Sequence, residues 1–103
     1  NFSLGAVMMM KVSAELAPYF PNVEIIELHH NHKYDAPSGT AILTAKLIND
    51  AKQAAKVTAD EDLTRESLPG ARGAKVDDVT IHSVRLQVMW LIKKYYLVVM
   101  MKH

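Results

Sequence analysis

The order of secondary-structure patterns in the first half of the chain restricts the fold to architectures that mix helices and strands. Residues Val23–His30 form a short run rich in Val and Ile, which is typical of a β-strand. Residues 31–40 are polar and turn-forming. From Ser38 to about Lys56 the apolar residues return at helical spacing. A strand, a loop and a helix in this order predict an α+β domain.

Patterns on either side of this segment add one more helix and one more strand. Residues 4–17 are nearly all apolar or small, which predicts a buried helix with Ser3 as its N-cap and an end before Pro18. Residues 57–74 are charged and contain turn formers, so we expect a long loop there. Residues Val76–Leu86 predict a second strand. The predicted fold is α+β, with a mixed β-sheet packed with helices.

The side chains of the first strand divide between its two faces. Alternation places Ile25, Glu27 and His29 on one face. The opposite face receives Glu24, Ile26, Leu28 and His30. Because apolar residues occur in both sets, both faces are predicted to be partly buried. The consecutive methionines Met8–Met10 are expected to pack in the core.

Composition limits the size, partners and compartment of the protein. The 103 residues, 50% hydrophobic and 22% charged, fit one small folded domain. A net charge of +1 predicts no strongly basic surface for nucleic acid. The absence of cysteine excludes disulfides and thiolate metal sites and is consistent with a cytoplasmic protein. The first sixteen residues lack the basic start of a signal peptide, and no membrane partner is expected.

Three histidines and a lysine fall close together, at His29, His30, His32 and Lys33. A polar strand end followed by a loop explains such a cluster without any function. Imidazole also binds zinc, so a metal-binding module on the three histidines is an alternative, although the spacing places no further ligand. A third interpretation is a proton-transfer site, because histidine titrates near neutral pH and lysine supplies a cation or a proton.

The residues that follow this cluster predict an anion-binding helix start. The run Pro37-Ser38-Gly39-Thr40 leads directly into the second helix, whose first backbone N–H groups have no helical partner and carry partial positive charge. An ordinary N-cap is the commoner use of Ser or Thr at this position. With Lys33 and the histidines nearby, the sequence also suits a small carboxylate substrate that receives a proton or hydride.

The segment Glu27–Ala41 reads Glu-Leu-His-His-Asn-His-Lys-Tyr-Asp-Ala-Pro-Ser-Gly-Thr-Ala. It resembles the signature of the 4-hydroxy-tetrahydrodipicolinate reductases, also called dihydrodipicolinate reductases. The stretches Asn1–Gly5 and Ile81–Leu86 resemble two further parts of the same family, so the resemblance covers about residues 1–86. It implies the C-terminal domain of that family, which binds substrate and mediates assembly, here in a truncated form.

The resemblance also implies an activity and a set of site residues. The family reduces 4-hydroxy-tetrahydrodipicolinate, a small cyclic dicarboxylate, to tetrahydrodipicolinate with NADPH or NADH in lysine and diaminopimelate biosynthesis, and it forms homotetramers. By position in the signature, His29 matches the proton donor and Lys33 the second catalytic residue. The positions that match the groups holding the substrate carboxylates are His30, Ser38, Gly39 and Thr40. Asn1 and Phe2 match cofactor contacts, and no metal is expected.

The sequence departs from the family at its two ends. It opens on Asn1 rather than Met, which suggests a fragment, and no Gly-x-Gly-x-x-Gly motif occurs. The N-terminal Rossmann-like domain of the family is therefore expected to be absent, and this chain alone is predicted not to be a competent enzyme. A non-enzymatic remnant without substrate affinity is the alternative. His82 and Arg85 are expected to be sheet residues or interface partners rather than catalysts.

Residues 87–103 differ in character from the rest of the chain. All eleven acidic residues, all four glycines and all four prolines lie before residue 79. After Leu86 the family continues Pro-Gly-x-Val-Ala-His-Gln-Glu-Val-x-Phe-Gly. A permitted coding of residues 87–103, shifted by one base, gives Pro-Gly-Tyr-Val-Ala-His-Gln-Glu-Val-Leu-Phe-Gly, and the single codons of Met89 and Trp90 force its first Val. We predict a frameshifted tail, apolar enough for a strand or a helix, including an interfacial helix.

Overall fold

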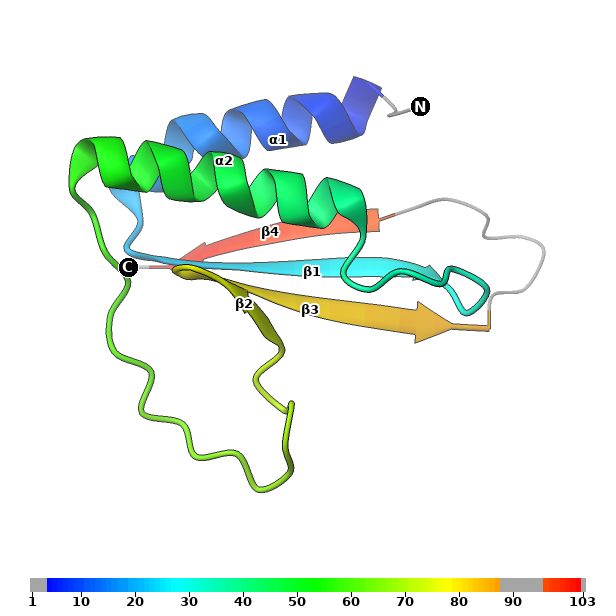
Figure 1. The fold of residues 1–103 in the computed structure, drawn as a ribbon. Helices are drawn as coiled ribbons and strands as arrows, with labels where there is room; N and C mark the ends of the chain where they lie inside the picture. Colours follow the sequence, from blue (N-terminus) through cyan, green and yellow to red (C-terminus); the bar gives the residue numbers. More distant parts are fainter. Residues whose placement is uncertain (1–3, 88–95, 103) are drawn as a thin grey trace.

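A computed structural model describes residues 4–87 and 96–102 of the chain. Two helices, α1 (Leu4–Leu16) and α2 (Gly39–Ala55), form one layer, and a four-stranded sheet forms the other (Figure 1). The strands are β1 (Asn22–His30), β2 (Ala74–Val76), β3 (Val79–Leu86) and β4 (Tyr96–Lys102). Both helices lie on the same side of the sheet (Figure 1). The predicted α+β fold with a mixed sheet packed with helices is confirmed.

The strand order β2-β3-β1-β4 places the first strand of the chain inside the sheet. Strands β1 and β3 are parallel, whereas β4 runs antiparallel to β1 and β2 antiparallel to β3. A parallel pair needs a long crossover connection, and here helix α2 lies in the connection between β1 and β3. The parallel pairing also aligns the ends of β1 and β3, with His29 opposite Arg85.

The hydrophobic core lies between α2 and the helix-facing side of β1 and β3. Its buried members are Ala17, Val23, Ile25, Ala41, Ala45, Ile48, Val79 and Ile81. On β1 the alternate residues Ile25 and Glu27 are fully buried, whereas Ile26 and Leu28 are only half-buried. Both faces were predicted to be partly buried. The structure instead buries the face under the helix layer completely in the middle of the strand, because α2 covers it.

The structure confirms the predicted position of helix α1 but not its predicted burial. It ends before a single 3-10 turn, Ala17–Tyr19, that contains the proline expected to end it. The predicted N-cap, Ser3, lies outside the described residues. The prediction of a buried helix with Met8–Met10 in the core is confirmed for Met10 and wrong for Met8 and Met9, which are exposed. The buried side of α1 carries Met10 and Ser13, and the helix it contacts is α2, whereas Lys11 and Glu15 share an exposed face.

The strand predicted at Val76–Leu86 is two strands. Strand β2 ends at Val76, a turn follows at Asp77 and Asp78, and β3 begins at Val79. Asp77 has φ 50°, the left-handed conformation that Asp tolerates better than most residues. Two consecutive aspartates therefore form the turn of a tight hairpin between β2 and β3.

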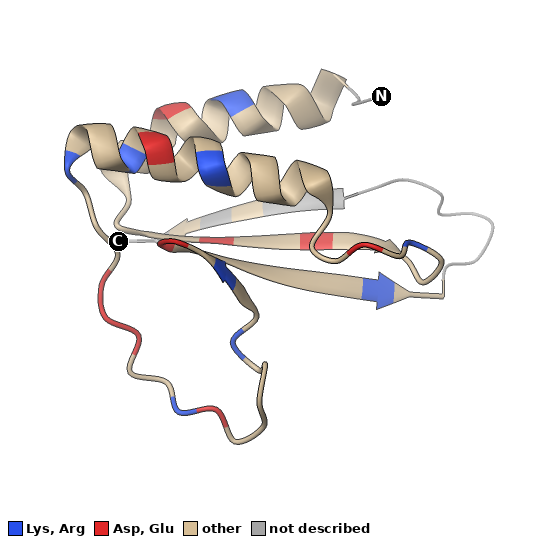
Figure 2. Cartoon of the chain, viewed as in Figure 1, with Lys and Arg blue, Asp and Glu red and all other residues tan. Residues whose placement is uncertain are grey.

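The predicted long loop is confirmed as an extended arm over residues 57–73, which projects away from the helices (Figure 1). Acidic and basic residues occur along it (Figure 2). Near the C-terminal end of the arm, Arg72 forms ion pairs with Glu24 of β1 at 3.2 Å and with Asp62 of the arm at 2.9 Å. Near the N-terminal end of the arm, Asn22 Nδ2 donates a hydrogen bond to Asp60 Oδ2 at 2.8 Å. Charged and polar contacts, not apolar packing, hold the arm.

Candidate anion-binding and proton-transfer site

The end of β1 carries a buried cluster of charged side chains. Glu27 and His29 are two residues apart on a strand, so their side chains lie on the same face. His29 Nε2 is 2.8 Å from Glu27 Oε2. Arg85, on the adjacent strand β3, places Nη1 2.6 Å from Glu27 Oε1. The side chain of Glu27 is only 1% exposed, so the carboxylate depends on these two neighbours for its solvation.

The surroundings of His29 favour its neutral form. Burial lowers the pKa of His29 below its ordinary value, and the positive charges of Arg85 and Lys33 and the neighbouring His30 lower this pKa further. Glu27 acts in the opposite sense and raises the pKa of His29. A bound anion would add to the effect of Glu27, so ligand binding would favour the protonated imidazole.

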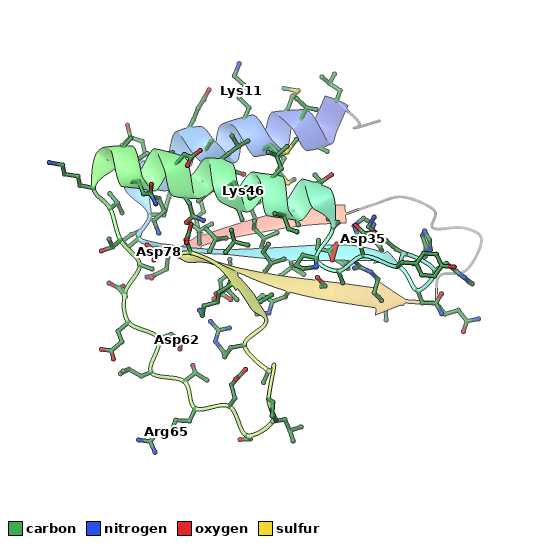
Figure 3. The ribbon with its side chains drawn as sticks, viewed as in Figure 1. Lys11, Asp35, Lys46, Asp62, Arg65 and Asp78 are labelled. Atoms are coloured by element: carbon green, nitrogen blue, oxygen red, sulfur yellow. The ribbon has the colours of Figure 1, made fainter. Side chains whose placement is uncertain are left out.

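Lys33 lies in the loop after β1 and faces a carboxylate of the same loop. Its Nζ is 3.1 Å from Asp35 Oδ1, and the lysine holds the pKa of Asp35 below its usual range. The Asp35 side chain is 61% exposed, and the labelled residue lies in the β1–α2 loop (Figure 3). An ammonium paired with an exposed carboxylate can exchange that partner for the carboxylate of a ligand at small cost.

The start of α2 completes the site. Ser38 is the N-cap, and its Oγ accepts a hydrogen bond from the Ala41 N–H at 3.2 Å. The first backbone N–H groups of the helix, at Gly39 and Thr40, have no helical acceptor. A Cβ added at Gly39 would meet nothing within 4 Å, so an anion has space to approach the backbone there.

Arg85 links the strand end to the loop. Its Nη2 donates to the Asp35 carbonyl at 2.8 Å, and its Nη1 also donates to the Val84 carbonyl at 2.9 Å. Arg85 thereby links the two predicted catalytic residues. It contacts Glu27, which lies beside His29, and it binds the backbone of Asp35, whose side chain pairs with Lys33. The remaining residues named from the sequence lie in the same stretch, namely His30, Ser38, Gly39 and Thr40. The predicted cofactor contacts Asn1 and Phe2 lie outside the described residues.

Sequence reasoning missed the roles of two residues. Arg85 was expected to be a sheet residue or an interface partner, and Glu27 was placed on the same strand face as His29 but was given no role. The two-residue spacing between Glu27 and His29 correctly predicted a shared strand face, but it did not by itself assign Glu27 a role beside the imidazole. The partner Arg85 is found only once the register of β1 and β3 is known. His82 instead pairs with Glu24 at 2.5 Å, a contact between neighbouring strands outside the site.

Within residues 4–87 and 96–102, no three side chains of His, Cys, Asp or Glu are placed to hold a metal ion. The rings of His30 and His32 are 6.0 Å apart, and His30 Nδ1 accepts a hydrogen bond from the His32 backbone. The β1–α2 connection, residues 31–38, contains no glycine, so it does not fit the glycine-rich phosphate turn of a dinucleotide-binding domain. None of the described helices is long and apolar enough to cross a membrane.

The fold and the candidate site define a class of protein: an α+β domain in which one segment runs from a buried histidine at the end of β1, through a lysine, to the capped start of α2. The chain belongs to the dihydrodipicolinate reductase family, and it matches the model of that family's C-terminus over residues 5–100. The resemblance of the segment Glu27–Ala41 to this family is thereby confirmed.

Individual relatives agree with the family assignment. The chain is 55% identical over 86 residues to the 4-hydroxy-tetrahydrodipicolinate reductase of Dictyoglomus turgidum and 59% identical over 87 residues to that of Streptococcus gordonii, covering 84% of this chain each time. It spans about a third of their length, 32% and 33%. A solved structure, the dipicolinate-bound dihydrodipicolinate reductase from Paenisporosarcina sp. TG-14, is similar to this chain with 39% sequence identity and a TM-score of 0.75. The match covers 100% of this chain and 41% of the Paenisporosarcina chain.

Proposed function

We propose that this chain is the substrate-binding and proton-transferring part of a reductase that converts 4-hydroxy-tetrahydrodipicolinate to tetrahydrodipicolinate with NADPH or NADH in the cytoplasm, within lysine and diaminopimelate biosynthesis. The observation that carries the proposal is the arrangement of the family signature, with His29 buried against Glu27 and followed by Lys33 and a capped helix start. Membership of the family supports it.

The substrate is a dicarboxylate, and the site offers separate donors for its carboxylates. The N–H groups of Gly39 and Thr40 and the positive end of α2 would hold one carboxylate. Lys33, released from Asp35, would face the other, and His30 lies beside the same loop. The roles proposed for these residues concern the substrate and the proton only, and the chain by itself is proposed to be inactive because no Gly-x-Gly-x-x-Gly motif occurs in it.

The order of binding and protonation follows from the charges around His29. Before substrate binds, burial and three neighbouring groups hold the pKa of His29 below its ordinary value, which favours the neutral ring near pH 7. A dianionic substrate offsets the charges of Lys33 and Arg85 and raises this pKa. His29 therefore takes up a proton when substrate binds and is ready to donate it to the substrate.

Calorimetric titration with pyridine-2,6-dicarboxylate tests the proposal, because this stable dianion mimics the substrate and is not reduced. We expect saturable binding by the 103-residue chain. Binding should be about tenfold weaker or more in Lys33→Ala, which is the loss expected for one charge-assisted contact. Lys46→Ala is the matched control, since Lys46 is an exposed lysine on α2 (Figure 3). If the unaltered chain does not bind pyridine-2,6-dicarboxylate, the alternative of a remnant without substrate affinity is favoured. In a separate titration with zinc alone, stoichiometric uptake would favour the metal-binding module.

Assembly of identical chains is proposed on a separate observation. The arm of residues 57–73 is extended and exposed, and the sheet face opposite the helices leaves Ile26 and Leu28 only half-buried. A second copy of the chain would cover both the arm and the sheet face opposite the helices. Light scattering coupled to gel filtration checks this proposal, and a monomer at all concentrations would contradict it.

A further inference from the structure

Glu27 is a buried carboxylate whose two oxygens have different partners. Oε1 accepts a hydrogen bond from Arg85 Nη1 at 2.6 Å. Oε2 lies 2.8 Å from His29 Nε2 and receives no hydrogen bond from the described residues. Such a carboxylate, 1% exposed, costs free energy unless both oxygens are compensated. The second oxygen is therefore best compensated when the imidazole of His29 carries a proton.

Arg85 fixes the carboxylate in place. Besides Glu27, the guanidinium donates to two backbone carbonyls, those of Val84 and Asp35, at 2.9 and 2.8 Å. Its side chain is 17% exposed. A guanidinium held at three points cannot follow a moving carboxylate, so the Arg85–Glu27 contact holds Oε2 at a constant place beside the ring of His29.

We infer that Glu27 is the positioning residue of His29: its carboxylate, clamped by Arg85, orients the imidazole and supports its protonated form. The inference rests on the proposed function only for the reason why His29 must carry a proton. Glu27 has no direct contact with the ligand in this role. It acts on the proton carrier, as a carboxylate does when it holds a catalytic imidazole in one orientation.

The charged groups around His29 give this role a measurable sign. Glu27, on the same strand, raises the pKa of His29, whereas Arg85 from β3, Lys33 from the loop and the adjacent His30 lower it. Removing the charge of Glu27 and removing the charge of Arg85 must therefore move the pKa of His29 in opposite directions. A residue that only stabilised the fold would not produce this pair of opposite changes.

Titration of the imidazole resonances by NMR in the 103-residue chain tests the inference. In Glu27→Gln we expect the pKa of His29 to fall by about one pH unit, and in Arg85→Gln we expect it to rise by about as much. Glu24→Gln is the matched control, because Glu24 lies on the opposite face of β1 and pairs with Arg72 and His82 instead. An unchanged His29 pKa in Glu27→Gln, or a change of the same sign in both variants, overturns the inference.

A measurement on the unaltered chain decides the question if a variant fails to fold. The carboxyl carbon of Glu27 should shift with pH at the same midpoint as the ring of His29, and a Glu27 signal that ignores the His29 titration overturns the inference. Binding of pyridine-2,6-dicarboxylate is measured on the same samples. If the pKa of His29 changes as expected but pyridine-2,6-dicarboxylate does not bind, the proposed function is contradicted and the positioning role of Glu27 is kept. If the dianion binds but the pKa of His29 does not change as expected, the positioning role is contradicted and the proposed function is kept.

Discussion

The protonation of His29 links the chemistry of the site to the stability of the fold. Burial lowers the pKa of His29 in the folded chain below the value of about 6.5 expected when it is unfolded. The unfolded chain therefore binds more protons between those two values. The free energy of unfolding must fall as the pH drops from neutral through the unfolded pKa toward the folded one.

His29→Asn should remove this part of the pH dependence. We expect urea denaturation at about pH 7.5 and about pH 5.5 to show a smaller loss of stability in the variant than in the unaltered chain. His32→Asn changes an exposed histidine of the same cluster and should retain the original loss. An equal loss in all three proteins would show that His29 is not the group responsible.

Ser38 allows the cap of α2 to be separated from anion binding. Aspartate caps helices about as well as serine, but Ser38 is only 3% exposed, so Ser38→Asp should lower the free energy of unfolding by about 1–3 kcal/mol and leave a folded chain. The new negative charge lies where a substrate carboxylate would bind, and affinity for pyridine-2,6-dicarboxylate should fall about tenfold or more. Thermal melts and calorimetry on the same samples measure both quantities. Undiminished affinity in a folded Ser38→Asp chain would remove the helix start from the proposed site.

Local residue chemistry made much of the candidate site predictable, and long-range pairing explains the rest. His29, Lys33 and Ser38 lie in one continuous segment, so their types and order already indicate proton transfer beside an anion-binding helix start. Arg85 joins that segment only through the parallel register of β1 and β3, and it lies 58 residues along the chain from Glu27. No local pattern contains that register.

At the scale of elements, polar side chains of α2 fasten the helix to the sheet. Asn49 donates to the Val76 carbonyl at 2.7 Å and accepts from the Asp78 N–H at 3.3 Å, on the two sides of the β2–β3 turn. Lys52, 1% exposed, donates to the Pro21 carbonyl before β1. The helix thereby fixes both the turn and the start of the central strand.

Asn49→Ala should weaken this attachment. The change leaves a carbonyl and an N–H of the turn without their partner, which costs about 1–3 kcal/mol in the free energy of unfolding. Asp50→Ala, at the next and exposed position of α2, is the control and should change stability by less than about 0.5 kcal/mol. Urea denaturation of both variants provides the comparison, and equal losses would show that the Asn49 bonds contribute nothing specific.

Helix bounds were more predictable than strand bounds or burial. The predicted helix from Ser38 to about Lys56 is α2, Gly39–Ala55, because its cap and its spacing are local signals. The hairpin at Asp77 was missed because the strand pattern of Val79–Leu86 was extended back across the two aspartates to Val76. The exposed side of α1 was missed because it carries apolar residues such as Met8, Met9 and Val12, and only the place of α2 decides which apolar residues are covered.

At the scale of the whole molecule, β4 closes the β1 side of the sheet with residues from the unusual tail. It pairs with β1 from Asn22 to Leu28. Backbone hydrogen bonds form a strand pair whatever the side chains, and the run Tyr-Leu-Val-Val-Met-Met has high strand propensity. A strand here is therefore compatible with a tail in either reading frame. The expected alternative of a helix is wrong for residues 96–102.

We propose that residues 87–103 are read one base out of frame, and the encoding DNA tests this directly. The relatives from Dictyoglomus and Streptococcus align over 86 or 87 residues, a length equal to the part before the proposed junction, while the family match extends to residue 100. The shifted frame should encode Pro-Gly-Tyr-Val-Ala-His-Gln-Glu-Val-Leu-Phe-Gly after Leu86. A chain carrying that peptide should pack a selected strand against β1 in place of an arbitrary one, and should melt about 4 °C higher or more. Codons that cannot give this peptide, or a restored chain no more stable than the present one, would contradict the proposal.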